Sequence, residues 1–576
     1  MVINVFSRLI IVFLSTLIIF SCVTTPQLPP QDPFIEDSSE DSSETEVPVT
    51  QSPTVSIADE IRNLTETGIL SSMLAALELI RNRDLGGTEF GRLMTGLNVL
   101  LIRLVYPDSP AALPSTDLPQ TSGYTRIIRE AQRGNYVRPA ANSTDFFEHI
   151  LPFFVINEDT TAEIFSNVLR DMERARTLRP NSIFPPFFQG QIHERQGRYR
   201  EAEAAYRQAY GISSECYPAQ IGIARVRRLS GNVREAITLF SELAIRYPDS
   251  LEIRRQLAIS YFENQDLSRA LSAIDEILRI EPRNGEFLLM RASILIEQGQ
   301  FNQANSSLDI YASINSNNRN YLYMRARVQA EGNRNRDSAL NYLRSILRTN
   351  PNDTEAMVYA ATLLMESPRA ADQNEGRELL ERLRRTAGSS VEVLSLGLKD
   401  AIQRENWQEA QGLLNRILAI RRTNQDLMDA YYVESGLGNN SRALSFAREL
   451  YDKDTANHEY TIVYISALID NGRRDEALRL IENRLNSAGS GSIKSRYYFL
   501  RSRLQSNQDN ALNDLRSSLF EDPRNLDALI ASFLIYHNRR EERRAVYFLR
   551  QALAISPDHP QLRRYEREYA SLLGRN

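Results

Sequence analysis

The segment Ile183–Cys216 reads IFPPFFQGQIHERQGRYREAEAAYRQAYGISSEC, and its features return many times further along the chain. On either side of Gly197, apolar and small residues recur every three or four positions, which predicts two helices joined by a short turn. Ala202 lies near the start of the second helix. The segment is therefore one helical hairpin, and its repetition predicts an array of such hairpins.

The alanine near the start of the second helix sets the period of this array. Successive equivalent positions are separated by 34, 34, 34, 35, 37, 34, 33, 34, 34 and 34 residues. These positions are Ala202, Ala236, Ala270, Ala304, Ala339, Gly376, Ala410, Ala443, Ala477, Ala511 and Ala545. A small residue here lets the two helices of a hairpin approach closely, while larger residues fill the groove beside them.

Three further features accompany the alanine in most units. The residue four positions on is usually bulky and apolar, as Tyr206 is after Ala202. The turn often contains glycine, at Gly197, Gly231, Gly299, Gly438 and Gly472. A proline that stops the second helix often stands twelve residues after the alanine, at Pro248, Pro282, Pro351, Pro523 and Pro557.

This pattern resembles the tetratricopeptide repeat. The resemblance implies an all-α, right-handed superhelical solenoid with about eleven units over residues 183–559, in which the first helix of each unit lines a concave surface. Residues 149–182 resemble a more divergent unit, and residues 560–576 suit a capping helix with a wet outer face. Two insertions, near residues 333–336 and 367–373, are expected in the turns between the two helices of a unit.

Residues 56–148 precede the array and match no repeat. Helical periodicity covers Ile57–Arg81, Thr88–Tyr106 and Tyr124–Arg133, with a proline-rich loop from Pro107 to Ser122. This region is expected to be helical, either as an N-terminal cap on the array or as a separate module.

The first 22 residues resemble a bacterial lipoprotein signal. An apolar run of about 12 residues, too short for a membrane span, ends in Ile19-Phe20-Ser21-Cys22. This ending is similar to a lipobox, although Phe20 departs from the strict pattern. We expect a signal peptide over residues 1–21 and lipidation of Cys22; an uncut signal anchor is the alternative. Either places the bulk of the chain in the cell envelope, outside the cytoplasmic membrane.

An acidic segment follows the predicted lipidation site. Residues 23–55 hold seven acidic residues, no basic residue and six prolines, with few apolar side chains. Such a composition predicts a disordered tether over residues 22–55. The net charge of the whole chain is −5, so the remaining body is nearly neutral. A nucleic-acid partner is therefore not expected, because such binders carry a marked basic excess.

The residues that carry catalysis or bind metals are scattered. The five histidines show no metal-ligand spacing, and no nucleotide-binding glycine motif or nucleophile elbow occurs. Of the two cysteines, Cys216 is expected to be a packed thiol. We therefore predict no catalytic residue, no metal and no cofactor.

The resemblance places a partner-binding groove on the first helices of the early units. Positions that face inward in the family correspond to Phe184, Phe187, Gln191, Arg225, Arg228, Arg255 and Phe262. Together they predict a partly basic, aromatic-lined pocket for an acidic and hydrophobic segment of a protein partner. Alternatively, the arginines pair with Glu194, Glu252 or Glu263 of adjacent helices and are structural.

Three functions fit these features. The first is a membrane-anchored scaffold that docks proteins for assembly or secretion in the periplasm. The second is a transport accessory that partners a substrate-binding protein or holds a hydrophobic ligand. The third is an enzyme with a site hidden in residues 56–148. An uninterrupted apolar inner stripe would favour the second function, and a stripe studded with arginine favours the first.

Overall fold

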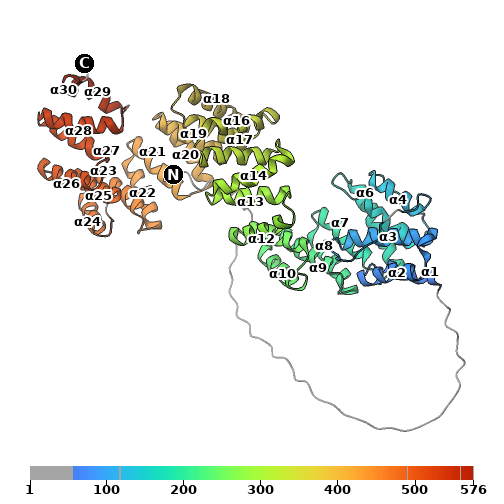
Figure 1. Cartoon of the computed structure of the whole chain (residues 1–576). Helices are drawn as coiled ribbons and strands as arrows, with labels where there is room; N and C mark the ends of the chain where they lie inside the picture. The colour runs from blue at the N-terminus through green and yellow to red at the C-terminus, as the bar shows by residue number, and fades with distance from the viewer. Residues whose placement is uncertain (1–55, 116–117, 490, 558, 575–576) are drawn as a thin grey trace, which may run out of the picture.

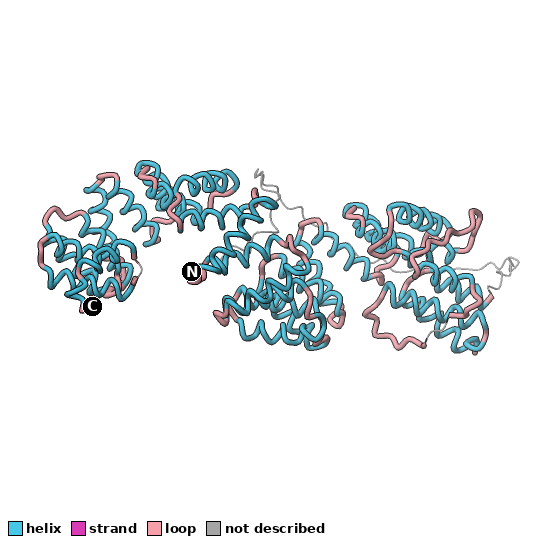
Figure 2. Tube along the Cα trace, turned by 90° about the horizontal axis from the view of Figure 1, so that it is seen from above, coloured by secondary structure: helices cyan, strands magenta, loops and turns pink. Residues whose placement is uncertain are grey.

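The computed structural model describes residues 56–115, 118–489, 491–557 and 559–574, and within them every regular element is a helix. The N-terminal helices and the C-terminal helices lie at opposite ends of an elongated, curving array (Figure 1). Figure 2 shows the same succession of helices and short loops from above. Residues 1–55, with the predicted signal peptide, Cys22 and the tether, lie outside the described residues.

From α7 to α28, consecutive helices pack as eleven hairpins within the described residues. The first helices are α7 (Phe184–Arg195), α9 (Tyr217–Leu229), α11 (Leu251–Glu263), α13 (Gly285–Glu297), α15 (Arg319–Arg327), α17 (Thr354–Met365), α19 (Val391–Gln403), α21 (Asn424–Gly436), α23 (His458–Asp470), α25 (Ser492–Arg503) and α27 (Leu526–Asn538). The second helices are α8 (Tyr199–Ile212), α10 (Val233–Arg246), α12 (Leu267–Ile280), α14 (Phe301–Asn315), α16 (Arg336–Thr349), α18 (Ala370–Ala387), α20 (Trp407–Ile420), α22 (Asn440–Lys453), α24 (Arg474–Leu485), α26 (Gln508–Glu521) and α28 (Glu542–Ile555).

The small residues allow the close packing that the sequence predicts. Ala202 is fully buried, and so is the bulky Tyr206 one turn later. The Tyr206 ring lies between two glycines of neighbouring first helices, Gly190 and Gly222. A Cβ atom at either glycine would come within 2.7 Å of the ring. Both glycines are therefore required by the helix spacing rather than by backbone conformation.

The turn inside each hairpin has a constant backbone shape. Five residues before the key alanine, the chain adopts a positive φ, for example +70° at Gly197 and +91° at Gly231. Four units place a non-glycine residue at this left-handed position: Gln265, Arg334, Glu405 and Arg540. A side chain there is strained, because its Cβ atom crowds the following carbonyl oxygen.

The two insertions are accommodated mainly in helices, and not in the turns as the sequence analysis expected. The first extends the helical part of the fifth hairpin with a π-helical turn, η3 (Val328–Gly332), directly after α15. The second lengthens α18, which begins six residues before Gly376 instead of the three residues seen before Ala202 in α8. A helix absorbs extra residues without leaving backbone groups unpaired.

Residues 56–182 form a helical cap that is continuous with the array. Its elements are α1 (Ile57–Glu66), α2 (Leu70–Asn82), η1 (Leu85–Gly87), α3 (Glu89–Val105), α4 (Gly123–Gln132), α5 (Phe146–Ile150), η2 (Leu151–Val155) and α6 (Ala162–Leu178). The predicted helix Ile57–Arg81 is two helices, separated at Gly68, where φ is +73°. One hydrophobic core runs from Ile61 in the cap to Val226 in the second hairpin.

Backbone contacts fasten the cap to the first hairpin. The amide of Ile183 donates a hydrogen bond to the carbonyl of Thr67 over 2.9 Å. Arg179 pairs with the buried carboxylate of Glu66. The region before the array is therefore an N-terminal cap, which is one of the two alternatives that the sequence left open.

The C-terminal end of the array is covered by two short helices instead of one. They are α29 (Pro560–Glu568) and α30 (Ala570–Leu573). Leu562 and Tyr569 bury their side chains against the last hairpin, and the Tyr569 hydroxyl lies 2.7 Å from Nδ1 of His537. The chain thus ends on a cap that shields the final apolar surface. No helix among the described residues has both the length and the apolar character needed to cross a membrane.

Candidate functional site

The first helices of the hairpins form the inner layer of the array. Neighbouring first helices contact each other directly, as α7 contacts α9 and α23 contacts α25. Neighbouring second helices make no comparable contact among the described residues. The second helices therefore lie on the outside of the curve, and the first helices line its inner surface.

Phe184 and Phe187 are not on the open part of this surface, which corrects the sequence analysis. Phe184 is fully buried and Phe187 is 3% exposed. Phe184 lies against Gly68 of the cap, and Phe187 packs on the Tyr206 ring at 5.8 Å between centroids. Residues 56–182 cover the first hairpin, so positions that line a groove in other units are part of the core here.

Arg225 is held by a carboxylate of the preceding first helix. Its Nε donates to Oε1 of Glu194 over 2.5 Å, and its second guanidinium nitrogen Nη2 donates to Oε2 over 2.9 Å. The hydroxyl of Tyr206 also donates to Glu194, over 2.8 Å. Desolvation of the guanidinium disfavours its charge, but Glu194 outweighs this effect and raises the pKa of Arg225. The bidentate pair thus links α7 to α9.

Arg228 and Arg255 are paired in the same way. Arg228 bonds Glu263 of α11 over 2.5 Å, and its side chain is only 9% exposed. Arg255 bonds Glu281, also over 2.5 Å, and Glu252 lies 3.9 Å from it. The three arginines therefore face four carboxylates, since Glu252 also lies 3.8 Å from Arg225. The expected partly basic pocket is not formed; in this structure the arginines hold adjacent helices together.

Such pairs recur as rungs between neighbouring first helices. Besides Glu194–Arg225 and Arg228–Glu263, the structure contains three more of these rungs at the same end of the helices. They are Glu297–Arg327 at 2.6 Å, Glu366–Lys399 at 3.7 Å and Asp470–Arg503 at 2.8 Å. Each rung uses up charges that the sequence alone would offer to a partner.

The rungs are interrupted between α11 and α13. One period after Arg225, Arg228 and Arg255, the equivalent positions carry Ile259, Phe262 and Leu289. All three are partly exposed. We call these three residues the apolar patch. Gln191 is also partly exposed, so Gln191 and Phe262 remain open to contact by a partner.

The apolar patch has a charged border. On one side lies the rung Arg228–Glu263 and on the other the rung Glu297–Arg327. An apolar centre with a polar rim is the usual anatomy of a protein interface. Sequence reasoning named only Phe262 as part of the partner site, because it selected arginines as anchors.

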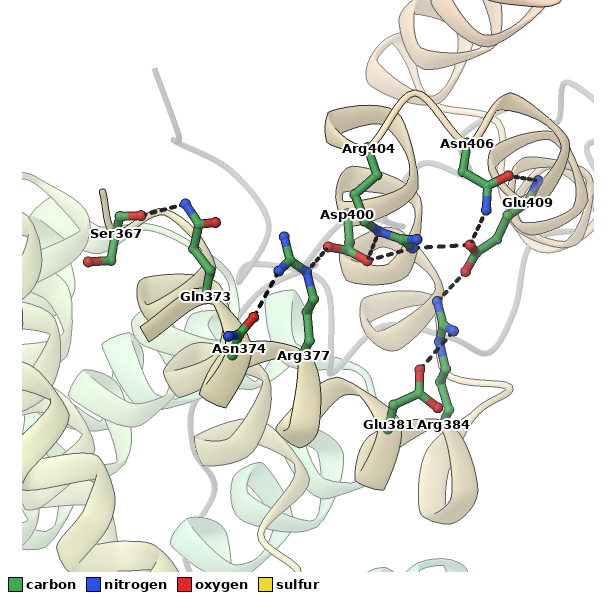
Figure 3. A network of polar contacts seen from close by, with 10 residues as sticks. All are labelled: Ser367, Gln373, Asn374, Arg377, Glu381, Arg384, Asp400, Arg404, Asn406 and Glu409. Atoms are coloured by element: carbon green, nitrogen blue, oxygen red, sulfur yellow. Dashed lines mark hydrogen bonds and ion pairs between the residues drawn. The ribbon is translucent and has the colours of Figure 1, made fainter. Parts of the chain in front are cut away.

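A further polar network lies in the sixth and seventh hairpins (Figure 3). Asp400, buried in α19, accepts from Arg377 of α18 over 3.0 Å and from Arg404 over 2.8 Å. Glu409 of α20 accepts from Arg384 over 2.7 Å and from Arg404 over 3.1 Å. These charges neutralise each other within the network, which therefore fastens α18, α19 and α20 together.

The titratable groups form no arrangement suited to catalysis that we can identify in the described part of the chain. There, no three His, Cys, Asp or Glu residues are close enough together to hold a metal ion. Cys216 is buried, and desolvation raises the pKa of its thiol to about 12, so it stays protonated. Burial also raises the pKa of Asp171 in α6 to about 6.

Comparison with known proteins supports the repeat assignment. A family model described as "Tetratricopeptide repeat" matches residues 194–260 and 261–328. The chain contains tetratricopeptide repeats and has an all-helical solenoid fold of that type. The human protein O-mannosyl-transferase TMTC1 is 25% identical over 130 residues. That match covers 22% of this chain and 15% of the human protein, so the chain spans only a small part of its length.

Solved structures with a similar fold include three with these values. Yeast Tom70 is 11% identical, with 72% of this chain and 92% of that chain covered and a TM-score of 0.34. PilF of Pseudomonas aeruginosa is 16% identical, with 42% and 100% covered and a TM-score of 0.33. PilW, a type IV pilus biogenesis factor, is 17% identical, with 37% and 96% covered and a TM-score of 0.33.

Proposed function

We propose that this chain is a non-catalytic scaffold that docks other proteins on its inner surface and is anchored to a bacterial envelope membrane through lipidated Cys22. The observation that carries the docking function is the apolar patch of Ile259, Phe262 and Leu289. It is the place where the inner surface of the regular early hairpins turns from paired charges to partly exposed apolar side chains. A partner helix or extended segment would bury these side chains.

The chemistry of the patch favours a protein segment. Burying apolar side chains inside a charged border excludes water from the centre of the contact, which is where most binding energy of an interface arises. The rungs on each side leave their outer edges solvated, so they fix the position of a partner rather than its affinity. The patch is therefore suited to hold a few apolar anchors of a partner.

The ion-pair rungs argue against the transport alternative. A protein that holds a hydrophobic ligand along its axis needs a continuous apolar inner stripe. Here the stripe is interrupted by charge on both sides of the patch, at Arg228–Glu263 and at Glu297–Arg327. Docking of a protein partner for assembly or secretion in the periplasm fits this alternation better.

Site-specific photo-crosslinking in native envelopes tests the docking site. A crosslinking amino acid at Phe262 or Leu289 should capture the same partner, and Phe262→Ser should reduce recovery of that partner from the wild-type background. Ile245 of α10 provides the matched control, because it is apolar, 84% exposed and on an outer helix. Equal capture from Ile245, or unchanged recovery with Phe262→Ser, would show that the partner docks elsewhere.

The anchor rests on the sequence alone, on the short apolar run that ends in Ser21-Cys22. In cells fed a labelled fatty acid, the wild-type chain should carry the label and enter the detergent phase. Cys22→Ala should lose both properties, and Cys216→Ala, which removes the other cysteine, should keep them. A Cys22→Ala chain labelled like the wild type would rule out lipidation at this residue.

A further inference from the structure

The two turns next to the insertions border a single hollow on the rim of the array. Its volume is about 490 Å³, within the range of about 300 to 1,000 Å³ that small-ligand sites occupy. One wall is the segment from Asn333 to Asp337, and the other is Ser367, Pro368 and Arg369. The π-helical turn and the lengthened α18 bring these walls into their positions, so the hollow exists because the repeat departs from its regular period here.

Three arginines line the hollow, and their needs are not all met. Arg369 is paired on both sides, with Asp337 over 2.7 Å and with Asp372 over 2.7 Å. Arg336 donates to the carbonyl of Glu366 over 3.2 Å, but its Nε is buried and has no partner. Arg334 is exposed, and no ion pair involves it in the part of the chain that the structure describes. The hollow therefore holds more positive than negative charge.

The repeat gives no structural reason for Arg334 or Arg336. Arg334 occupies the left-handed turn position, with φ of +52°, where five other turns use glycine. Arg336 is the first residue of α16, a position that other units fill with an apolar residue such as Phe301 or Trp407. Charged, strained side chains that replace packed or unstrained ones are a feature of functional sites.

The backbone adds to the positive potential. The segment 335–337 is the start of α16, and Arg369 is the N-cap residue of α18, so two helix N-termini meet at the hollow. No side chain caps α18. The amides at a helix start favour a negative group by their unpaired donors and by the helix dipole.

From these features together we propose that the hollow binds a carboxylate-bearing, acidic segment of a protein partner. The forked guanidinium groups of Arg334 and Arg336 would grip a side-chain carboxylate in bidentate fashion. The Asn333, Asn335 and Ser367 side chains offer neutral hydrogen bonds to the backbone of the same segment. The inference rests on the proposed docking function only in taking a protein as the source of the carboxylate. The hollow and the apolar patch are separate surfaces, so one can fail without the other.

Fluorescence anisotropy with a labelled hexaglutamate peptide tests the site on the purified soluble chain, residues 56–576. Arg334→Gly removes one guanidinium and also relieves the left-handed backbone, so it should raise or preserve the melting temperature. We expect it to weaken peptide binding about tenfold. Arg540→Gly is the matched control, because Arg540 is an exposed arginine at the same turn position of another unit, with φ of +58°. It should bind the peptide like the wild type.

Three results would overturn the proposal. The first is unchanged binding by Arg334→Gly, and the second is an equal loss with Arg540→Gly, which would indicate unspecific attraction to arginines. The third is binding of inorganic phosphate at the hollow without binding of hexaglutamate, which would make it a site for a small anion. None of these results bears on crosslinking from Phe262, so failure here is distinguishable from failure of the docking function.

Discussion

The carboxylate of Asp108 accepts a hydrogen bond from the hydroxyl of Ser250 over 2.7 Å, although 142 residues separate them in the chain. The same carboxylate oxygen accepts from the amide of Glu252 over 3.0 Å. Ser250 is the N-cap residue of α11, so a residue of the cap satisfies the start of a helix in the third hairpin. The aromatic contact of Tyr106 with Tyr217, at 5.7 Å between centroids, lies between these two points. The cap therefore fastens three hairpins and not only the first.

Removing this contact should loosen α11 from a distance. Asp108→Ala leaves the amide of Glu252 and the Ser250 hydroxyl without their acceptor, which should cost about 1 kcal/mol of local stability. Hydrogen exchange at the first turn of α11 should then be faster by about fivefold. Asp159→Ala, which removes an exposed carboxylate of the cap with no partner side chain, serves as the control. Unchanged exchange in α11 would mean that the contact adds nothing.

Reversing the charge of Arg225 should destabilise the early hairpins. Arg225→Glu places a carboxylate next to Glu194 and Glu252 in a half-buried site, which should cost about 2 kcal/mol or more. The swap Glu194→Arg with Arg225→Glu should recover part of this loss. The melting temperature and the exchange of α7 and α9 measure both effects. Arg234→Glu, on the outer helix α10, should leave both near the wild-type values.

If the swap recovers nothing, the pair is not coupled and the rung is not a stabilising device. If Arg225→Glu melts like the wild type while losing a partner, the arginine serves binding, and the original interpretation of the sequence returns.

A glycine at a strained turn should stabilise the array. Glu405 adopts a φ of +56° at the position where five units have glycine, and its side chain is exposed. Glu405→Gly should gain about 1 kcal/mol by removing the crowded Cβ atom. Glu405→Ala keeps that atom and should change little. Chemical unfolding followed through Trp407, which begins the adjacent helix α20, reports on this unit. Equal stability of the glycine and alanine variants would contradict the argument.

Burial of Asp171 should make the cap more stable at acidic pH. Desolvation raises its pKa to about 6, although Tyr136 donates a hydrogen bond to it over 2.7 Å. The folded pKa therefore lies above the ordinary value of about 3.9, and the native state binds the proton more tightly than the unfolded state. This contribution is complete below about pH 4 and is lost as the pH rises through 6.

Asp171→Asn removes the titration. Its stability advantage over the wild type should grow from near zero at pH 4 to as much as about 3 kcal/mol at pH 8. Hydrogen exchange of α6, measured across this range for both proteins, follows the difference. An advantage that is constant with pH would show that Asp171 is ionised in the folded protein throughout.

The repeat was predictable because it depends on local spacing. The period of about 34 residues, the buried alanines such as Ala202 and the turn glycines such as Gly197 all follow from contacts within one hairpin. Each hairpin must bury the same stripe against its neighbours, so one set of residue sizes returns in every unit. The insertions were detected for the same reason, but their place in helices was not, since a spacing does not show where the backbone takes up an extra residue.

The functional surface was predicted only in part. Phe262 is partly exposed on the inner layer as expected, and its neighbours Ile259 and Leu289 were within reach of the same repeat arithmetic. The hollow beside Arg334 carried a weaker signal, an arginine at a glycine position next to an insertion. Its second wall comes from the following unit, 33 residues on, so no local pattern reveals it.

What only the tertiary structure decided is which side chains are left over for a partner. The sequence by itself determined the array of hairpins, because periodic burial is a property of short segments. It could not determine that Arg225 meets Glu194, because that pairing depends on the distance and angle between two helices of different units. Nor could it place Phe184 in the core, because the covering residues belong to the cap, which has no repeat from which its contacts could be inferred. Charge pairing and burial depend on neighbours in space, and those neighbours are set by the packing of the whole chain.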